Sequence, residues 1–387
     1  MFADRTNWNL SPNALTEALA RRRAAGKRIL DLTVSNPTEC GFVYDEKKIR
    51  AALSQNTSLA YEPNPRGLPS ARRAVANYYR DFAAEIPIDD IFLTTSTSEA
   101  YSFAFRILCN PGDELLIPEP SYPLFDFLAE IQDVKLVRYP LIYDHGWQVD
   151  FHGLERAITS LSRGVIVVHP NNPTGQFCKR AEMAKLSELC SCQGLALIAD
   201  EVFLDFGLQG ETPATFVSSS QTLTFTLSGI SKICGLPQMK LAWIVLSGPQ
   251  ELKQQASSRL EVISDTYLSL GAPTQLALPD WLETGRRFQE QALERMKSNL
   301  AELDRQLGKQ LVSSRLVVEG GWCAILRVPS GATDEELSVQ LLESEGVQVH
   351  PGHFYGLPER GFLVVSLLTR IEVFAEAIHK ALKLLMN

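Results

Sequence analysis

A lysine after a turn of small residues is the first feature of this sequence that suggests covalent chemistry. Lys232 ends the segment Ser-Gly-Ile-Ser-Lys (228–232), which follows the β-rich run 222–227, and Lys240 stands eight residues further on. A lysine that is shielded from water can keep a neutral amine and act as a nucleophile. Most lysines lie on the surface, so Lys232 alone does not define a reaction.

Polar residues also follow two apolar runs. Asp200 and Glu201 come directly after residues 195–199, which are all apolar. A charge at the end of a buried strand needs a partner, because its transfer from water into an apolar interior is costly. The segment His-Pro-Asn-Asn-Pro-Thr-Gly (169–175) follows the run 164–168 and has the composition of a turn.

Hydroxyl side chains gather where a helix is expected to begin. The segment Thr-Ser-Thr-Ser-Glu (95–99) follows the run 91–94. The N–H groups and dipole of a helix N-terminus favour a bound phosphate, and Ser96, Thr97 and Ser98 would add hydroxyl groups. A simple N-cap needs one such residue. A phosphate site and a cap therefore both remain open at this point.

Alternating elements place these four loops at one edge of a sheet. Between residues 90 and 246, seven short β-rich runs alternate with helical stretches, which is typical of a mostly parallel sheet with helices on both faces. The expected strands are 91–94, 115–117, 134–139, 164–168, 195–199, 222–227 and 241–246, and the expected helices are 99–108, 122–132, 153–160 and 179–192. In such α/β sheets, ligands bind beyond the carboxyl ends of the strands.

The pattern changes after residue 273. A long amphipathic segment, 274–307, leads to three further expected strands (315–318, 324–328 and 362–367) and two helices (334–345 and 371–386). This group predicts a smaller α+β domain. We expect a large domain over residues 46–285, and a small domain that combines residues 1–45 with 286–387.

Composition excludes several classes of protein. The chain has 387 residues with a net charge of −8, which argues against a nucleic-acid surface. Its seven scattered cysteines form no CxxC pair, and no signal peptide is evident, so a reducing cytoplasm is expected. The longest apolar runs are too short to span a bilayer. We therefore predict a cytoplasmic protein without a membrane or nucleic-acid partner and without a metal site.

The order of the polar segments resembles the class I and II aminotransferases, which belong to fold type I of the enzymes that use pyridoxal 5′-phosphate (PLP). The resemblance covers essentially the whole chain. Asn-Pro-Thr-Gly, then Asp-Glu-Val, then Ser-Lys in this order is a specific combination. The matching segments are Asn36-Pro37-Thr38, Tyr61 with Pro65-Arg66-Gly67-Leu68-Pro69, Glu119-Pro120-Ser121-Tyr122-Pro123, Asn172-Pro173-Thr174-Gly175, Asp200-Glu201-Val202, Ser231-Lys232, Gly320-Gly321 and Pro351-Gly352.

The resemblance implies a role for each matching residue. Lys232 would hold PLP as a Schiff base and later move a proton, and Asp200 would pair with the pyridine nitrogen. Asn172 would donate to the 3′-oxygen of the ring, and Tyr122 would stack on the ring face.

The remaining cofactor contacts concern the phosphate. The resemblance implies that Ser96, Thr97 and Ser98 hold it together with Lys240. Tyr61 would reach the phosphate in the neighbouring subunit's site, which implies a homodimer with shared active sites.

Two positions near the cofactor differ from the family pattern. The family usually has a tyrosine where this chain has Phe203, so the 3′-oxygen of the ring loses a donor and the pKa of the lysine-bound cofactor should be raised. Lys240 stands where arginine is common. Lysine keeps the positive charge but lacks the bidentate fork of arginine.

A third difference concerns the substrate. Family members carry an arginine near the C-terminus that binds the α-carboxylate of the substrate. Alignment on Ser366 places Val364 there, or Leu363 after a shift of one residue, and neither can bind a carboxylate. We assign substrate contacts to Ser35 and Arg360. The alternatives to Arg360, which spacing does not separate from it, are Arg370, Arg327 and Arg66.

The sequence therefore predicts an aminotransferase that moves an amino group between an amino acid and a 2-oxo acid. A PLP-dependent lyase of the same fold, either a C–S β-lyase or an enzyme like aminocyclopropane-carboxylate synthase, shares every cofactor residue named above and remains the alternative. A transcription regulator with an aminotransferase-like domain is disfavoured, because the chain is acidic and has no added basic helix-turn-helix module.

Overall fold

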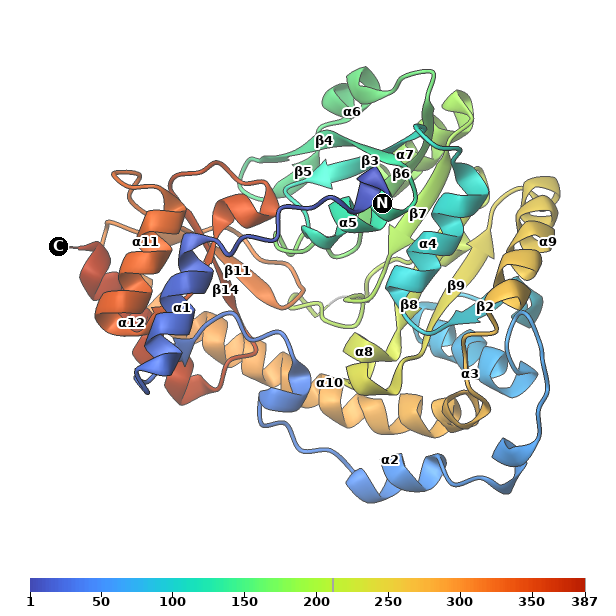
Figure 1. The fold of residues 1–387 in the computed structure, drawn as a ribbon, viewed down its shortest axis with the longest axis horizontal. Helices are drawn as coiled ribbons and strands as arrows, with labels where there is room; N and C mark the ends of the chain where they lie inside the picture. The colour runs from blue at the N-terminus through green and yellow to red at the C-terminus, as the bar shows by residue number, and fades with distance from the viewer. Residues whose placement is uncertain (211, 387) are drawn as a thin grey trace.

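The fold is an α/β arrangement of one large sheet, flanking helices and a second group of smaller elements (Figure 1). The structure is a computed structural model and describes residues 1–210 and 212–386. Within these residues, no helix has both the length and the apolar character needed to cross a membrane.

The large sheet has eight strands. They are β2 (Ile91–Thr94), β3 (Glu114–Glu119), β4 (Lys135–Tyr143), β5 (Trp147–Val149), β6 (Ser162–Val168), β7 (Ala196–Asp200), β8 (Thr224–Gly229) and β9 (Ala242–Ser247). Their spatial order is β2-β9-β8-β7-β6-β3-β4-β5. The five neighbours from β8 to β4 are parallel, whereas β9 is antiparallel to both of its neighbours and β5 is antiparallel to β4.

The predicted fold class is confirmed, and the number of strands is corrected from seven to eight. All seven predicted strands occur, and β5 is the addition. It has only three residues at the edge of the sheet, with a buried, exposed and buried side chain in turn. So short an alternation is not distinguishable from a loop in a sequence.

Both faces of this sheet are covered, which explains the continuous apolar runs. On β6, the side chain of Ile166 joins one hydrophobic core with helices α4 and α5, whereas Val165 and Val167 join another on the opposite face. Side chains of successive strand residues point to opposite faces. A strand covered on both faces therefore lacks polar positions in its middle.

Helices surround the large sheet. They are α2 (Glu46–Ala52), α3 (Pro69–Tyr79), α4 (Thr97–Leu108), α5 (Leu124–Ile131), α6 (Phe151–Ala157), α7 (Arg180–Gln193), α8 (Ile230–Ile233) and α9 (Gln250–Tyr267). Short 3-10 turns connect the elements: η1 (Asp4–Thr6), η2 (Pro37–Glu39), η3 (Asn56–Leu59), η4 (Arg80–Phe82), η5 (Ile88–Asp90), η6 (Phe216–Ser218), η7 (Pro237–Met239) and η9 (Gly352–Tyr355).

One long helix, α10 (Ala272–Leu307), connects the large sheet to the smaller elements. It packs against α2 and α3 near its start and against α12 (Ile371–Leu385) further on. Figure 1 shows α10 running beneath both groups. The predicted amphipathic segment 274–307 corresponds closely to this helix.

The smaller elements combine α1 and β1 from the N-terminal part of the chain with the C-terminal elements. A four-stranded sheet has the order β10 (Ser314–Arg315), β11 (Cys323–Arg327), β14 (Phe362–Ser366) and β13 (His350–Pro351). Helix α11 (Asp334–Gln340), the π-helix η8 (Leu341–Glu345) and α12 pack beside it together with α1 (Ala14–Ala24). Strand β1 (Leu30–Asp31) pairs in parallel with β12 (Val347–Gln348).

Candidate active site

A cavity of about 250 Å³ lies where the carboxyl ends of the large sheet meet β13 and β14. Its walls include eight of the residues that the sequence singled out: Ser35, Thr97, Ser98, Tyr122, Asn172, Asp200, Phe203 and Lys232. Asn172, Asp200 and Lys232 follow or end the adjacent strands β6, β7 and β8. Parallel neighbours place their carboxyl ends at one edge, and this brings three separate loops together.

Lys232 lies in the short helix α8, directly after β8. Its Nζ is 4.7 Å from the ring centroid of Trp322 and 5.6 Å from that of Phe203. Burial lowers the pKa of this amine, while Cys323, Asp200 and Cys40 act in the opposite direction. The environment therefore favours the neutral, nucleophilic amine.

Asp200 ends β7 with a buried carboxylate. The Tyr101 hydroxyl donates to its Oδ2 at 2.9 Å, and the Val202 N–H donates to its Oδ1 at 3.1 Å. Burial raises the pKa of Asp200 to about 6, although these two hydrogen bonds and Lys232 oppose the shift. A cationic ligand next to this carboxylate would favour its ionised form.

Glu201, the neighbour of Asp200, serves the interior and not the cavity. It is fully buried and accepts hydrogen bonds from the Thr215 hydroxyl at 2.7 Å and the Phe216 N–H at 2.6 Å. Burial raises the pKa of Glu201 to about 8. Its bonds tie the loop around residue 215 to the end of β7, which makes Glu201 a structural residue.

The hydroxyl cluster combines a cap with an open helix end. Ser96 is the N-cap of α4, because its Oγ accepts the Glu99 N–H at 3.2 Å, and it does not line the cavity. Thr97 and Ser98 do line it. They form the first turn of the helix, where N–H groups have no partner within the helix. Ser96 is therefore a helix cap, whereas Thr97 and Ser98 leave the helix end open toward the cavity, as the phosphate prediction requires.

Three further residues that the sequence predicted for the site lie outside the cavity. Lys240 is exposed, in a left-handed conformation with φ 51°, and it does not line the cavity. Tyr61 is 77% exposed and lines a separate depression beside Asn64 and Ser264. Arg360 is exposed, and its Nη1 donates to the carbonyls of Ser330 and Gly331 at 3.3 Å. The structure therefore does not bring Arg360 to the cavity.

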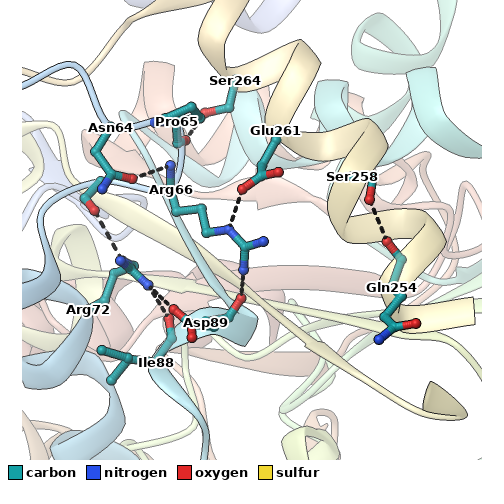
Figure 2. Close-up of polar contacts among 11 residues, drawn as sticks. Asn64, Pro65, Arg66, Arg72, Ile88, Asp89, Gln254, Ser258, Glu261 and Ser264 are labelled. Carbon is teal, nitrogen blue, oxygen red and sulfur yellow. Dashed lines mark hydrogen bonds and ion pairs between the residues drawn. The ribbon is translucent and has the colours of Figure 1, made fainter. Parts of the chain in front are cut away.

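Arg66, another arginine that the sequence allowed at the substrate, is held at a different place. Figure 2 shows its guanidinium between Glu261 and Asp89, with Nε donating to Glu261 Oε1 at 2.7 Å and Nη1 donating to the Asp89 carbonyl. Its guanidinium also lies 5.0 Å from the ring centroid of Phe92. These contacts leave Arg66 outside the cavity.

The other two arginines do not line the cavity either. Arg327 is exposed, with its guanidinium 6.0 Å from the ring centroids of Tyr143 and Phe362, and Arg370 packs over Gly41. By contrast, Val364 lines the cavity, whereas Leu363 belongs to the hydrophobic core. The alignment on Ser366 is therefore the one whose side chain faces the site. The lining residues that the structure describes include no arginine.

The sequence missed several residues of this cavity. They are Tyr101, Trp322, Cys323, His350 and Tyr355. Tyr101 could have been predicted from the sequence, because it lies four residues after Thr97 and three after Ser98, on the same face of α4. Trp322 and His350 adjoin the matched segments Gly320-Gly321 and Pro351-Gly352. Nothing in their spacing indicates that they face the same cavity as Lys232.

This chain belongs to the class I and II aminotransferase family, whose model matches residues 27–378. A glutamate–pyruvate aminotransferase of Escherichia coli is 28% identical over 262 residues, which cover 67% of this chain and 64% of that protein. An alanine aminotransferase of Mycobacterium bovis is 29% identical over 67% of this chain and 61% of that protein. The match thus spans less than two thirds of each relative's length.

Solved structures support the fold over the full length. An aminotransferase from Escherichia coli superposes with a TM-score of 0.88 at 22% identity, covering 100% of this chain and 98% of that one. An alanine aminotransferase from Pyrococcus furiosus gives a TM-score of 0.88 at 21% identity, with both chains fully covered. At this level of identity, the likeness establishes the fold and not the reaction.

Proposed function

We propose that this protein is a PLP-dependent aminotransferase that moves an amino group between an amino acid and a 2-oxo acid. The observation that carries the proposal is the meeting of Lys232, Asp200 and Asn172 around one cavity in a chain of this family. A desolvated amine, a buried carboxylate and an amide from three neighbouring strand ends are the groups that such a reaction requires.

The polar groups of the cavity fit PLP. The Asn172 Oδ1 is buried and has no hydrogen-bond partner among the described residues. The orphaned Oδ1 requires a donor from a polar ligand, and the N–H groups of the same amide, which make no hydrogen bond with the described residues, can donate to an acceptor such as the 3′-oxygen. The Asp200 carboxylate accepts two hydrogen bonds from neutral donors and is suited to a cationic N–H. The first turn of α4 offers free N–H groups to a phosphate.

When bound, PLP supplies a conjugated ring that accepts electrons from the Cα of an amino substrate. Lys232 holds the cofactor and then moves the proton that leaves this Cα. Asp200 keeps a proton on the pyridine nitrogen, and Tyr101 fixes the position of the carboxylate through the bond to Oδ2. Asn172 donates to the ring 3′-oxygen.

Further residues complete the proposed cofactor site. Tyr122 covers the ring, and Thr97 and Ser98 bind the phosphate. Phe203 provides an apolar wall beside Lys232. Contacts of Ser96 and Lys240 with the phosphate rest on the resemblance alone, since neither side chain lines the cavity.

The proposal extends to the assembly, the domains and the compartment. Tyr61 is exposed and outside its own cavity, as a residue that serves a neighbouring subunit would be, so we infer a homodimer with shared sites. The scattered cysteines support a location in the reducing cytoplasm. Residues 46–285 would form the large domain, and 1–45 with 286–387 the small domain. Pairing of β1 with β12 supports the second grouping.

Transfer of a labelled amino group tests the proposed reaction directly. The holoenzyme is incubated with ¹⁵N-labelled amino donors and either pyruvate or 2-oxoglutarate. An aminotransferase places the label in the new amino acid and releases the 2-oxo acid of the donor. Mass spectrometry of the products measures both.

The same experiment separates the alternative. A C–S β-lyase of this fold would release the label as ammonia and form pyruvate from a donor with a leaving group at Cβ, whereas an enzyme like aminocyclopropane-carboxylate synthase would keep the label in a cyclic product of the donor. Labelled ammonia without a labelled amino acid would therefore contradict the proposal. The Lys232→Ala variant serves as the control, since neither product should form without the lysine.

A further inference from the structure

An ionisable side chain stands next to the position where the family arginine is missing. His350 of β13 is directly opposite Val364 of β14 in the antiparallel pairing, and both line the cavity. Side chains of directly opposite residues point to the same face of a sheet, with Cβ atoms about 5 Å apart. His350 therefore reaches the space that an arginine at position 364 would occupy.

A second side chain holds this imidazole in place. The Tyr355 hydroxyl of η9 and His350 Nδ1 are 2.9 Å apart and share a hydrogen bond. Nε2 makes no hydrogen bond within the described part of the chain. When the ring is protonated, Nδ1–H donates to Tyr355 and Nε2–H is free to donate to a ligand. The arrangement fixes the ring and leaves one donor available.

The surroundings of His350 decide its charge. Burial lowers its pKa, and Asp31 on β1 acts weakly in the opposite direction. The other titratable groups that line the cavity include Lys232, Asp200, Tyr122 and Cys323. Asp334 of α11 is hydrogen-bonded to the His353 ring at 2.7 Å and not to His350. Burial therefore favours the neutral imidazole near pH 7. A bound anion would stabilise the charged imidazolium form.

Apart from His350, the substrate wall carries the uncharged hydroxyl groups of Thr33, Ser35 and Ser366 and is otherwise largely apolar. Leu124, Leu128, Trp322, Val364 and Val365 line it, and among the described lining residues only Lys232 and His350 can carry a positive charge. The cavity thus provides a cation for one carboxylate and none for a second. Its other surfaces suit a hydrocarbon side chain.

We propose that His350, oriented by Tyr355, receives the α-carboxylate of the amino donor in place of an arginine, and that the donor is a monocarboxylic amino acid with an apolar side chain. This inference rests on the proposed aminotransferase function for the identity of the donor. As the carboxylate binds, the imidazole takes up a proton from the solvent. Binding should therefore be strongest at low pH and weaken as the pH rises, whereas an arginine would give no such dependence.

Equilibrium binding of an inert ligand tests this without any turnover. Isothermal titration calorimetry of the holoenzyme compares 3-phenylpropionate with its neutral amide at pH 6 and pH 8. The expected result is that the carboxylate binds roughly tenfold more tightly than the amide at pH 6, and that this advantage falls roughly five- to tenfold at pH 8. An ordinary carboxylic acid is fully ionised at both values, so the change reports on the protein.

Three variants locate the effect. His350→Gln places an uncharged amide near the Nε2 position and should abolish both the carboxylate preference and its pH dependence. Tyr355→Phe should weaken the preference less, because the ring remains. His152→Gln, the same change at an exposed site on α6, is the control and should behave like the parent.

Each outcome decides the assignment. An unchanged carboxylate preference in His350→Gln would overturn the assignment. It would also be overturned if the parent protein bound the amide as tightly as the carboxylate, or if it did not bind the carboxylate detectably. The result is separate from the labelled-transfer experiment. If no labelled amino acid forms while His350 still determines carboxylate binding, the proposed aminotransferase reaction is wrong but the assignment of His350 as the carboxylate site is retained.

Discussion

The two walls of the cavity differ in how much polar structure they carry. The wall on the large sheet holds Lys232, Asp200 and Asn172, each at the end of a strand or just after it. The opposite wall, from β13 and β14, presents Val364 with a single ionisable group, His350. In the proposed function, the first wall supplies the groups for chemistry on a bound cofactor, and the second wall selects the substrate. The reaction class and the substrate therefore depend on separate parts of the fold.

Removal of the Lys232 amine is the strongest test of the wall on the large sheet, the cofactor wall. Lys232→Ala should lose covalent attachment of PLP and reduce turnover by at least roughly 10²–10⁴-fold, because the group that moves the proton is gone. Reduction with borohydride followed by peptide mapping measures the attachment. In the parent, the reduced adduct should map to Lys232.

Lys240→Ala is the matched comparison. Lys240 is exposed and outside the cavity, so its loss should leave the adduct on Lys232. An adduct mapped to Lys240 or to any other lysine of the parent would contradict the assignment of the cofactor wall.

Tyr101→Phe tests how the cofactor wall holds its carboxylate. The hydroxyl donates to Asp200 Oδ2, and a hydrogen bond to a charged group contributes about 1.5–3 kcal/mol. Its loss should raise the pKa of Asp200 above about 6 and weaken cofactor binding by roughly 10- to 100-fold. Because the proposed function requires ionised Asp200 to bind the ring, the loss of cofactor affinity should grow as the pH falls. Equilibrium dialysis of PLP at pH 6 and 8 measures it.

Tyr79→Phe is a suitable control for this variant. Tyr79 is also fully buried, but its hydroxyl accepts a hydrogen bond from Trp243 and does not contact Asp200. If both variants lose the same cofactor affinity, the effect comes from altered packing and not from the bond to Asp200.

Val364→Arg tests the second wall by adding the missing cation. The side chain should enter the cavity and make charge-assisted bonds with the α-carboxylate, so KM for small amino donors such as alanine should fall roughly tenfold. Steady-state kinetics at pH 7 and pH 8.5 measure it. The pH dependence of KM that His350 introduces should shrink in this variant.

Leu363→Arg provides the contrast. Leu363 is fully buried in the core and does not line the cavity, so an arginine there should destabilise the fold without lowering KM. Equal kinetic gains in the two variants would mean that the alignment of β14 on Ser366 is wrong.

The difference between the walls also explains what the sequence could predict. Lys232, Asp200 and Asn172 follow β-rich runs along the chain, so strand periodicity and segment order together located them. His350 faces the cavity only because the two-residue strand β13 pairs with β14, and two residues carry no periodic signal. Arg360 is close to β14 in sequence, yet the turn before the strand directs it to the carbonyls of Ser330 and Gly331. Contacts between segments that are distant in the sequence therefore determine whether His350 and Arg360 reach the cavity.

Phe203→Tyr is expected to give the smallest effect, and it tests the boundary between the two walls. Phe203 lines the cavity beside Lys232, and its ring packs 5.2 Å from that of Trp322. A tyrosine hydroxyl there would donate to the ionised 3′-oxygen of the ring and stabilise the deprotonated lysine-bound cofactor. A bond worth about 1 kcal/mol should lower the pKa of this chromophore by about half to one unit.

A spectroscopic pH titration of parent and Phe203→Tyr measures this shift. Tyr267 is half exposed and packs against Phe103 and Arg106 of α4, so Tyr267→Phe is a control that should leave the pKa unchanged. A lower pKa in Phe203→Tyr alone would place position 203 beside the 3′-oxygen. An unchanged or higher value would mean that the ring of residue 203 belongs to the apolar cluster with Trp322 and contributes to the shape of the substrate wall instead.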